Sequence, residues 1–323
     1  MNDHSLSPSL NPALDHTVHH KPKAAEAFPA LDFAAWTANH LQSVETALSL
    51  WLPAQAPAGL GDSMRYAVLD GGKRLRPLLT LAACEAVSGQ YAAALRAACA
   101  AELIHAYSLV HDDMPCMDND ILRRGKPTVH VKFGQAQALL AGDALQALAF
   151  ELLTPDDASI PASAQARLCG LLARAAGEAG MAGGQAIDLA SVGHQLSEDA
   201  LRQMHRLKTG ALLQASVMMG AACGPSSAQA LAALADYGSA IGLAFQVVDD
   251  ILDVTADSAT LGKTAGKDAD NDKPTYVSLM GLAASQAYAQ ALYQQAAFAL
   301  EASGLADTRA LLALAQMVVQ RAH

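Results

Sequence analysis

The chain has 323 residues, of which 52% are hydrophobic, and its formal net charge is −10. An acidic chain of this kind is a poor partner for nucleic acid, so no such role is expected. Only 5% of the residues are aromatic, and alanine is abundant, which favours closely packed helices over a sheet. Five widely spaced cysteines predict reduced thiols in a cytoplasmic protein, with neither a disulfide framework nor a zinc site.

The first 30 residues differ in composition from the rest of the chain. Residues 1–30 are polar, contain several prolines and show no periodicity, which predicts a disordered extension without a secretory signal. Residues 31–323 are expected to form a single all-helical domain. Two charge-poor stretches, 211–235 and 274–300, are interrupted by Gln, Ser and Gly. We interpret them as buried bundle helices, so no transmembrane segment is expected.

Apolar periodicity predicts helices along most of the chain, with no convincing strand. The predicted helices cover residues 33–52, 60–69, 77–88, 92–113, 135–153, 162–179, 181–190, 198–222, 227–253, 276–302 and 307–321. Residues 116–133 are expected to form a loop. The sequence KTG at 208–210 predicts a kink within helix 198–222, where a freed carbonyl could face a ligand.

A basic loop with two glycines, GGKRLRP, occupies residues 71–77. Glycine lets the backbone approach a ligand closely, and the N-terminus of the next helix adds partial positive charge. With Lys73, Arg74 and Arg76, this loop predicts a phosphate site, although it lacks the GxxxxGK[ST] pattern of a nucleotide P-loop. His105 lies two helical turns before Asp112, and a core role and a site role are equally supported for it.

An acidic cluster follows the apolar stretch 100–110. It contains Asp112, Asp113, Asp118 and Asp120, followed by Arg123, Arg124 and Lys126. Aspartate is rarely buried unless it is paired or bound to a metal, and clustered carboxylates suit Mg²⁺ that also binds substrate phosphates. On a regular helix, Asp112 and Asp118 would face different ways. Pro115 therefore predicts that the helix ends between them and that Asp118 turns back toward Asp112.

A second acidic cluster, Asp249, Asp250 and Asp253, ends another apolar helix. Asp249 and Asp253 are four residues apart, so they face the same way and can share a metal. A solvated helix end would explain one such cluster but not two, each following an apolar helix and each followed by basic residues. Neither has the spacing of a calcium loop. Residues 256–273 follow directly and are glycine-rich and charged, which suggests a mobile lid.

In this order and spacing, the motifs resemble those of the trans-prenyltransferases, the head-to-tail isoprenyl diphosphate synthases. The resemblance covers about residues 33–323 and rests on GGKRLRP at 71–77, DDMPCMD at 112–118 with RRGKPT after it, KTG at 208–210 and FQVVDDILD at 245–253. The segments YSLVHDDMP and IGLAFQVVDDILDV are similar to the corresponding segments of the bacterial farnesyl diphosphate synthases. The resemblance implies an all-α isoprenoid synthase fold, with antiparallel helices around a deep central cavity, and a homodimer.

The resemblance also implies an activity and a set of site residues. The reaction would be Mg²⁺-dependent condensation of isopentenyl diphosphate with dimethylallyl and geranyl diphosphate, which yields farnesyl diphosphate and diphosphate. A cluster of about three Mg²⁺ ions, with Mn²⁺ as an alternative, would be bound by Asp112, Asp118 and Asp249 and supported by Asp113, Asp250 and Asp253. Isopentenyl diphosphate would be held by Lys73, Arg76, His105 and Arg124. The allylic diphosphate would be held by Arg123, Lys208, Thr209, Gln246, Lys263 and Lys273.

The implied catalytic residues are Lys208, Thr209 and Gln246, whose oxygen atoms would stabilise an allylic carbocation. The implied marks of a C15 product are an aromatic residue five positions before the first aspartate and two extra residues in the motif. Tyr107 and Pro115–Cys116 occupy these places. Helical spacing alone would instead point to Ser108, one turn below Asp112.

Four other interpretations remain. A geranylgeranyl or longer-chain synthase would share every motif except the marks of chain length. A terpene cyclase needs one diphosphate site, which leaves GGKRLRP unexplained. A non-catalytic regulatory subunit of the same fold should have lost metal-binding or phosphate-binding residues, and none is missing. A plain metal-binding bundle would need neither Lys73, Arg76 and Arg124 nor the kink.

Overall fold

The computed structural model describes residues 1, 30–69, 71–157, 159–194, 196–255 and 275–320. The chain divides into two units, Met1–Ala30 and Leu31–His323. The predicted extension over residues 1–30 lies outside the described residues except for its two ends. The predicted lid at 256–273 lies outside them altogether.

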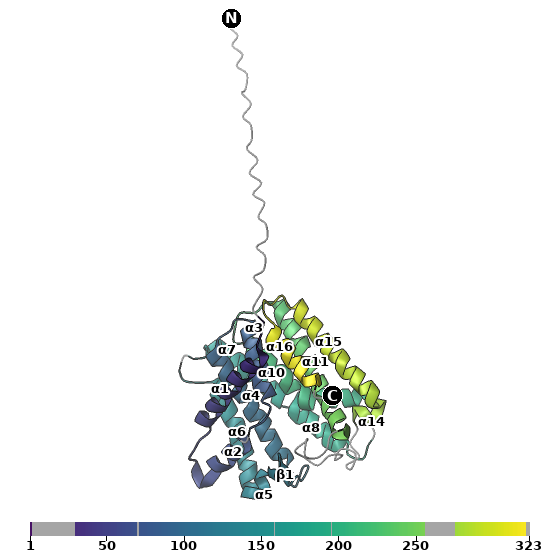
Figure 1. The fold of residues 1–323 in the computed structure, drawn as a ribbon. Helices are drawn as coiled ribbons and strands as arrows, with labels where there is room; N and C mark the ends of the chain where they lie inside the picture. Colours follow the sequence, from purple (N-terminus) through teal and green to yellow (C-terminus); the bar gives the residue numbers. More distant parts are fainter. Residues whose placement is uncertain (2–29, 70, 158, 195, 256–274, 321–323) are drawn as a thin grey trace. The chain divides into compact units, whose positions relative to one another are not determined.

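Helices build nearly all of the described part of Leu31–His323 (Figure 1). The α-helices are α1 Phe33–Trp51, α2 Leu60–Val68, α3 Leu75–Ala86, α4 Tyr91–Asp112, α5 Val129–Phe133, α6 Gln135–Leu153, α7 Ala162–Ala176, α8 Met181–Ala190, α9 Glu198–His205, α10 Ala211–Ala221, α11 Ala228–Thr255, α14 Tyr276–Met280, α15 Leu282–Ala302 and α16 Arg309–Gln320. A 3₁₀ turn, η1 Pro57–Gly59, precedes α2, and a π-helical segment, η2 Arg206–Gly210, joins α9 to α10. The predicted all-α class is confirmed.

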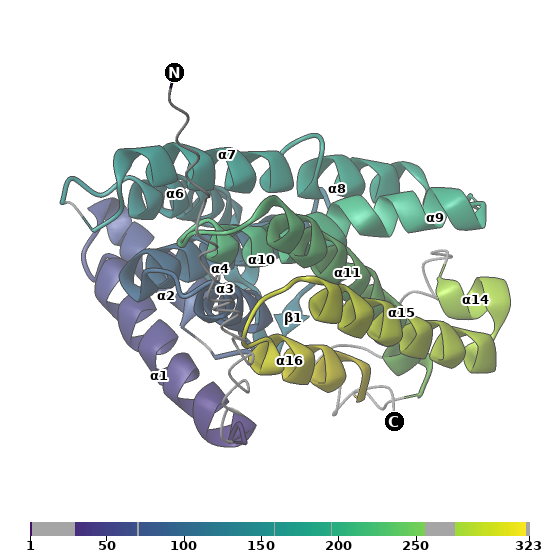
Figure 2. The same cartoon turned by 90° about the horizontal axis from the view of Figure 1, so that it is seen from above.

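Helices α3, α4 and α10 lie at the centre of the bundle, with α1, α7, α15 and α16 around them (Figure 2). More than half of the buried residues of α4 are alanines, which let its neighbours approach closely. One hydrophobic cluster joins α4 to α1, α2, α6 and α7, and a second joins α3 and α10 to α11, α15 and α16. The two clusters fix α4 and α11, the helices that end in the acidic clusters.

Three described helices, α4, α6 and α11, are long and apolar enough to cross a membrane by length and composition alone. Helices α4 and α11 pack against several other helices of the bundle, so burial accounts for their apolar composition. The charge-poor stretches 211–235 and 274–300 also fall in packed helices, namely α10, the start of α11, α14 and α15. Helix α6 keeps an exposed apolar face, where Leu139 and Leu140 are about half exposed.

At the place of the predicted kink, residues 208–210, regular α-helical bonding gives way to the π-helical segment η2. Here the chain lies very close to two other helices. An added Cβ on Gly184 of α8 would collide with the backbone nitrogen of Lys208, and one on Gly242 of α11 would lie 2.8 Å from the Cα of Gly210. Glycines at these contacts therefore allow α8 and α11 to pack directly against η2.

The expectation of no strand was wrong at one place. Strands β1 Leu122–Arg123 and β2 Lys126–Pro127 form an antiparallel hairpin, with Leu122 paired to Pro127. The two turn residues, Arg124 and Gly125, have φ values of 53° and 73°, as a two-residue turn of this hand requires. Strands this short leave no alternating pattern to recognise in a sequence. Gly281, with φ 84°, also divides the predicted helix 276–302 into α14 and α15.

Candidate active site

The first acidic cluster lies where α4 ends. Regular helical bonding stops at Asp112, and the chain turns so that the backbone N–H of Asp118 donates to the carbonyl of Asp112 over 2.9 Å. The predicted helix end between these residues is therefore confirmed. Burial raises the pKa of Asp112 to about 6; the charge of Lys208 opposes this, and the charge of Asp118 adds to it. Because the charge of Asp118 acts on Asp112, a cation bound at these carboxylates would be favoured.

Asp113 faces away from this pair and is neutralised by Arg123. The carboxylate is 2% exposed, and it accepts hydrogen bonds from Nε and Nη2 of Arg123 over 2.6 to 3.1 Å. A bidentate guanidinium–carboxylate pair of this kind is strong and directional. The pair ties the end of α4 to strand β1 and so positions the hairpin over the site.

Arg124 stands at the tip of the hairpin and reaches the glycine loop. Its guanidinium donates to the carbonyl of Gly71, and an added Cβ on Gly72 would lie 2.9 Å from its Nη atoms. Gly72, with φ 138°, is thus required for the close approach of this arginine. In this structure Arg124 is the group that approaches the glycine loop, and the predicted approach of a phosphate to this loop stays a prediction.

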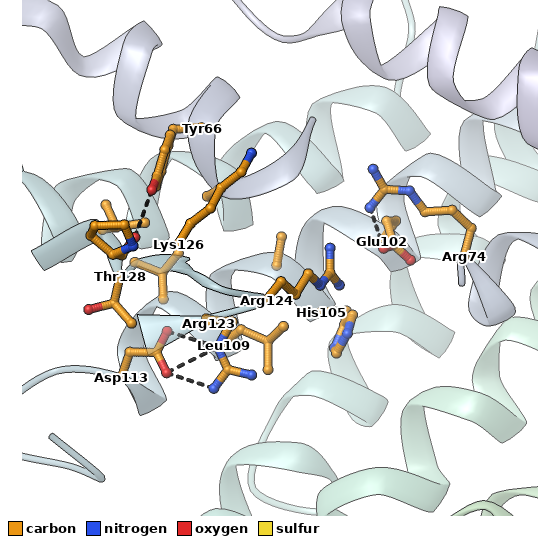
Figure 3. Close-up of a pocket in the computed structure, with 15 residues that line it drawn as sticks. Tyr66, Arg74, Glu102, His105, Leu109, Asp113, Arg123, Arg124, Lys126 and Thr128 are labelled. Atoms are coloured by element: carbon orange, nitrogen blue, oxygen red, sulfur yellow. Dashed lines mark hydrogen bonds and ion pairs between the residues drawn. The ribbon is translucent and has the colours of Figure 1, made fainter. Parts of the chain in front are cut away.

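A pocket of ≈ 50 Å³ lies between the hairpin and α4, and Arg124 and His105 both line it (Figure 3). Burial lowers the pKa of His105 well below its ordinary value, and the charges of Arg76, Arg124, Arg123 and Arg74 lower it further. The imidazole is therefore neutral at pH 7. Several positive charges around a neutral imidazole form a setting suited to an anion such as a diphosphate.

The three basic residues of the 73–76 run have different surroundings. Arg74 is 3% exposed and forms ion pairs with Glu45 and Glu102, at 2.7 and 2.8 Å. Burial lowers the pKa of Arg76, while Glu102 and Asp249 act to raise it, and its Nε has no hydrogen-bond partner among the described residues. Lys73 is exposed. Arg74 thus stabilises the fold, whereas Arg76 lines the larger of the two cavities.

A larger cavity of ≈ 390 Å³ lies between α4, α8 and η2. It brings together Arg76, His105, Tyr107, Ser108, Asp112, Lys208 and Thr209 from the predicted site. Tyr107 is half-buried and packs edge-on against His111, with ring centroids 5.7 Å apart. The Ser108 hydroxyl donates instead to the backbone carbonyl of His105 over 2.8 Å.

Two sets of hydrogen bonds hold the η2 side of the cavity in place. Lys208 Nζ donates to Asp188 of α8 over 2.6 Å. Thr209 Oγ1 donates to Gln246 Oε1 over 3.1 Å, and Gln246 Nε2 donates to Asp250 over 2.9 Å. Asp250 also accepts from the backbone N–H of Tyr276, so its carboxylate is engaged within the protein.

The three aspartates of the second acidic cluster differ in how deeply they are buried. Asp250 and Asp253 are 2% and 4% exposed, whereas Asp249 is half-buried and close enough to Arg76 to affect its pKa. No aspartate of this cluster lines either cavity in the part of the chain that the structure describes. Lys263 and Lys273 lie outside the described residues.

Among the described residues, no three His, Cys, Asp or Glu side chains converge as a ready metal cage. The acidic groups still fit Mg²⁺, which binds through one or two carboxylates and completes its shell with water and substrate phosphates. Asp112 supports this fit to Mg²⁺. Burial disfavours its charged form, the charge of Asp118 adds to that effect, and a bound cation would offset both.

Several polar residues near the cavities were not expected from the sequence. Asp188 pairs with Lys208, Glu102 pairs with Arg74, and Gln185 lines the larger cavity. Gln185 and Asp188 are three residues apart, directly after the glycines of GMAGGQ, so their shared helix face was the available signal.

Residues 57–304 match the polyprenyl synthetase family. Geranylgeranyl pyrophosphate synthase 11, chloroplastic, of Arabidopsis thaliana is 43% identical over 321 residues, which cover 98% of this chain and 90% of that protein. The chloroplastic large subunit 1 of a heterodimeric geranylgeranyl pyrophosphate synthase from Arabidopsis thaliana is 45% identical over 298 residues, covering 90% and 80%.

Solved structures with similar folds point to the same family. An FPP/GFPP synthase from Zymomonas mobilis has a TM-score of 0.79 at 40% identity and covers 89% of this chain and 99% of its own. A geranyltransferase from Helicobacter pylori, complexed with magnesium and isoprenyl diphosphate, has a TM-score of 0.78 at 34% identity, covering 91% and 98%. The chain therefore belongs to the polyprenyl synthetase family of trans-isoprenyl diphosphate synthases and has their all-α isoprenoid synthase fold.

Proposed function

We propose that the protein condenses isopentenyl diphosphate with an allylic diphosphate, head to tail, in a Mg²⁺-dependent reaction. One observation carries the proposal: the cavity lined by Asp112, Lys208 and Thr209 adjoins a pocket rich in arginine. A carboxylate end suits a metal-bound diphosphate, and the arginine pocket suits a second diphosphate. A single-substrate cyclase would have no use for the second pocket.

The chain's own residues would have distinct tasks. Arg76, Arg124 and neutral His105 would hold isopentenyl diphosphate, together with Lys73. Lys208 would hold the allylic diphosphate, while Arg123 would be shared between that diphosphate and Asp113. The Thr209 hydroxyl, fixed by Gln246, would keep an oxygen facing the reacting carbon, and the apolar cavity wall would exclude water.

Asp112, Asp118 and Asp249 would bind about three Mg²⁺ ions with the diphosphate, and Mn²⁺ is an alternative ion. When bound, the metal neutralises charge on the departing diphosphate. Asp250 and Asp253 would support this arrangement from within the fold, since both are buried. Asp113 would support it indirectly by positioning Arg123.

Two product lengths have support. The curated relatives named above are geranylgeranyl synthases, so the comparisons favour a C20 product over the farnesyl product expected from the motifs. The solved FPP/GFPP synthase and the position of Tyr107 on the cavity wall keep the C15 product as the second candidate. A tyrosine ring at this place would shorten the space available to the growing chain.

We also propose a homodimer, with the exposed apolar face of α6 as its contact surface. One curated relative is a subunit of a heterodimer, so a different partner subunit is the competing arrangement. A cytoplasmic location stays a prediction, because the plant relatives are named as chloroplastic.

The test is a product assay with purified protein, Mg²⁺ and isopentenyl diphosphate. Dimethylallyl, geranyl or farnesyl diphosphate is added in separate reactions, and the products are dephosphorylated and sized. A C20 alcohol from all three starters establishes the geranylgeranyl product, and arrest at C15 establishes the farnesyl product. Activity that survives EDTA, or the absence of condensation with every starter, overturns the proposal.

A further inference from the structure

The side chain of Gln185 is a polar group in the larger cavity to which neither sequence nor comparison assigns a role. It lies in the middle of α8, lines the cavity and is 9% exposed. Neither its amide oxygen nor its amide nitrogen has a hydrogen-bond partner among the described residues. Such burial costs about 1–3 kcal/mol, so an apolar residue would serve the fold better here.

The packing of α8 fixes the height of Gln185 in the cavity. The preceding residue, Gly184, contacts the backbone nitrogen of Lys208 so closely that a Cβ would collide with it. One turn further along α8, Asp188 accepts a hydrogen bond from Lys208 Nζ. Gln185 is therefore held at the level of Lys208 and Thr209, where the allylic carbon would lie.

The surroundings of Gln185 on α8 indicate which part of a ligand it faces. Met181, Ala182 and Ala186 line the same cavity, so this wall is apolar apart from the amide. Lys208 Nζ, from the neighbouring segment η2, is held at Asp188, one turn toward the end of α8. The space beside Gln185 thus suits the hydrocarbon of an allylic substrate rather than its diphosphate.

An amide beside hydrocarbon is poorly matched in the ground state and well matched to a positive carbon. Its oxygen carries partial negative charge, and interactions that strengthen only in the transition state raise the rate. Gln246, in comparison, has its amide oxygen occupied by the Thr209 hydroxyl and its amide nitrogen by Asp250. The Gln185 amide oxygen, in contrast, is buried without a hydrogen-bond partner among the described residues.

We propose that the amide oxygen of Gln185 contacts the allylic chain next to its reacting carbon and stabilises the positive charge that develops there. The C–O bond of the allylic diphosphate breaks, and its electron pair leaves on diphosphate. The C=C electrons of isopentenyl diphosphate form the new C–C bond, and a proton then leaves to the released diphosphate. This role deepens the proposed function and rests on it.

The test compares the wild type with Gln185→Met and Gln185→Leu. The kcat of both variants should fall by about 10- to 100-fold. The Kd for geranyl thiolodiphosphate, an unreactive allylic analogue, should change less than about twofold, because the ground-state contact is weak. The thermal midpoint of both ligand-free variants should stay equal or rise, because a buried amide that has no partner among the described residues is removed.

Gln229→Leu is the matched control. Gln229 lies outside both cavities and donates to the carbonyl of Ala302 over 2.6 Å, so its loss should lower the thermal midpoint and leave kcat unchanged. A wild-type kcat for Gln185→Met overturns the inference. So does a Kd that rises in parallel with the loss of kcat, or a lower thermal midpoint, which indicates a structural role. A wild type that makes no prenyl product overturns the proposed function as well.

Discussion

The guanidinium of Arg123 contacts both carboxylate oxygens of Asp113, with Nη2 2.6 Å from Oδ1 and Nε 2.9 Å from Oδ2. Asp113 is the second aspartate of the first acidic cluster, yet its carboxylate forms an ion pair with Arg123 and so holds the hairpin. The roles of adjacent aspartates therefore differ, because Asp112 faces the cavity and Asp113 faces β1.

Arg123→Ala should lower the free energy of unfolding by about 3 kcal/mol, because it leaves the buried carboxylate of Asp113 without its partner. Adding Asp113→Asn should recover much of the loss. Denaturant unfolding followed by circular dichroism measures both. As a control, Arg202→Ala breaks an exposed pair with Glu198 and should cost about 0.5 kcal/mol or less. Equal losses in the two single variants would contradict the structural role of the Asp113 pair.

Tyr107→Ala should lengthen the prenyl product, because it removes a ring from the cavity wall. Sizing of the dephosphorylated products measures the change. Ser108→Ala is the control, since the Ser108 hydroxyl is engaged by the backbone of its own helix and should not set the product length. An unchanged product from Tyr107→Ala, or a longer one from Ser108→Ala, would show that Tyr107 is not the residue that limits the length of the product.

Gly184→Ala should lower both stability and kcat, because the new Cβ collides with the backbone of Lys208 and forces α8 away from η2. Overpacking of this kind costs about 1–3 kcal/mol. Gly170→Ala is the matched control within a helix, where the new Cβ would lie 3.6 Å from Arg174. It should stabilise the protein by about 0.5–1 kcal/mol and leave kcat unchanged. A fully active Gly184→Ala would mean that the contact tolerates displacement.

Stability should fall below pH 6.5 because of His205. Burial lowers the pKa of His205 to about 4, while the charge of Asp188 opposes this and that of Lys208 adds to it. Between pH 6.5 and about 4 the unfolded chain binds a proton that the folded chain does not, so up to about 3 kcal/mol of unfolding free energy is lost as the pH falls. His205→Gln should flatten this part of the pH–stability curve, measured by urea unfolding. A variant curve parallel to that of the wild type would assign the loss to other groups.

Leu140→Glu should convert the proposed dimer into a monomer, because it places a charge on the exposed apolar face of α6. Light scattering coupled to size-exclusion chromatography measures the mass. Phe298→Glu changes an apolar side chain that is 71% exposed on α15, and it should leave the mass unchanged. A monomeric wild type would overturn the proposed homodimer.

The sequence by itself determined the all-α class, most helix positions and the end of α4 near Pro115. Each of these depends on local chemistry: apolar periodicity, proline geometry and runs of like charge leave their pattern within a few neighbouring residues. Lys208, Thr209 and Asp112 were also recognisable, because each belongs to a short motif with an unusual composition.

Only the tertiary structure decided which charges meet. Asp188 pairs with Lys208 twenty positions away, Arg74 with Glu102 at twenty-eight, and Arg124 reaches the glycine loop from fifty-three. The same holds for the hairpin, whose strands are too short for a pattern, and for the amide of Gln185, which has no partner in the described part of the chain. Pairing and burial depend on neighbours brought together by packing, and no local sequence pattern records which neighbours those are.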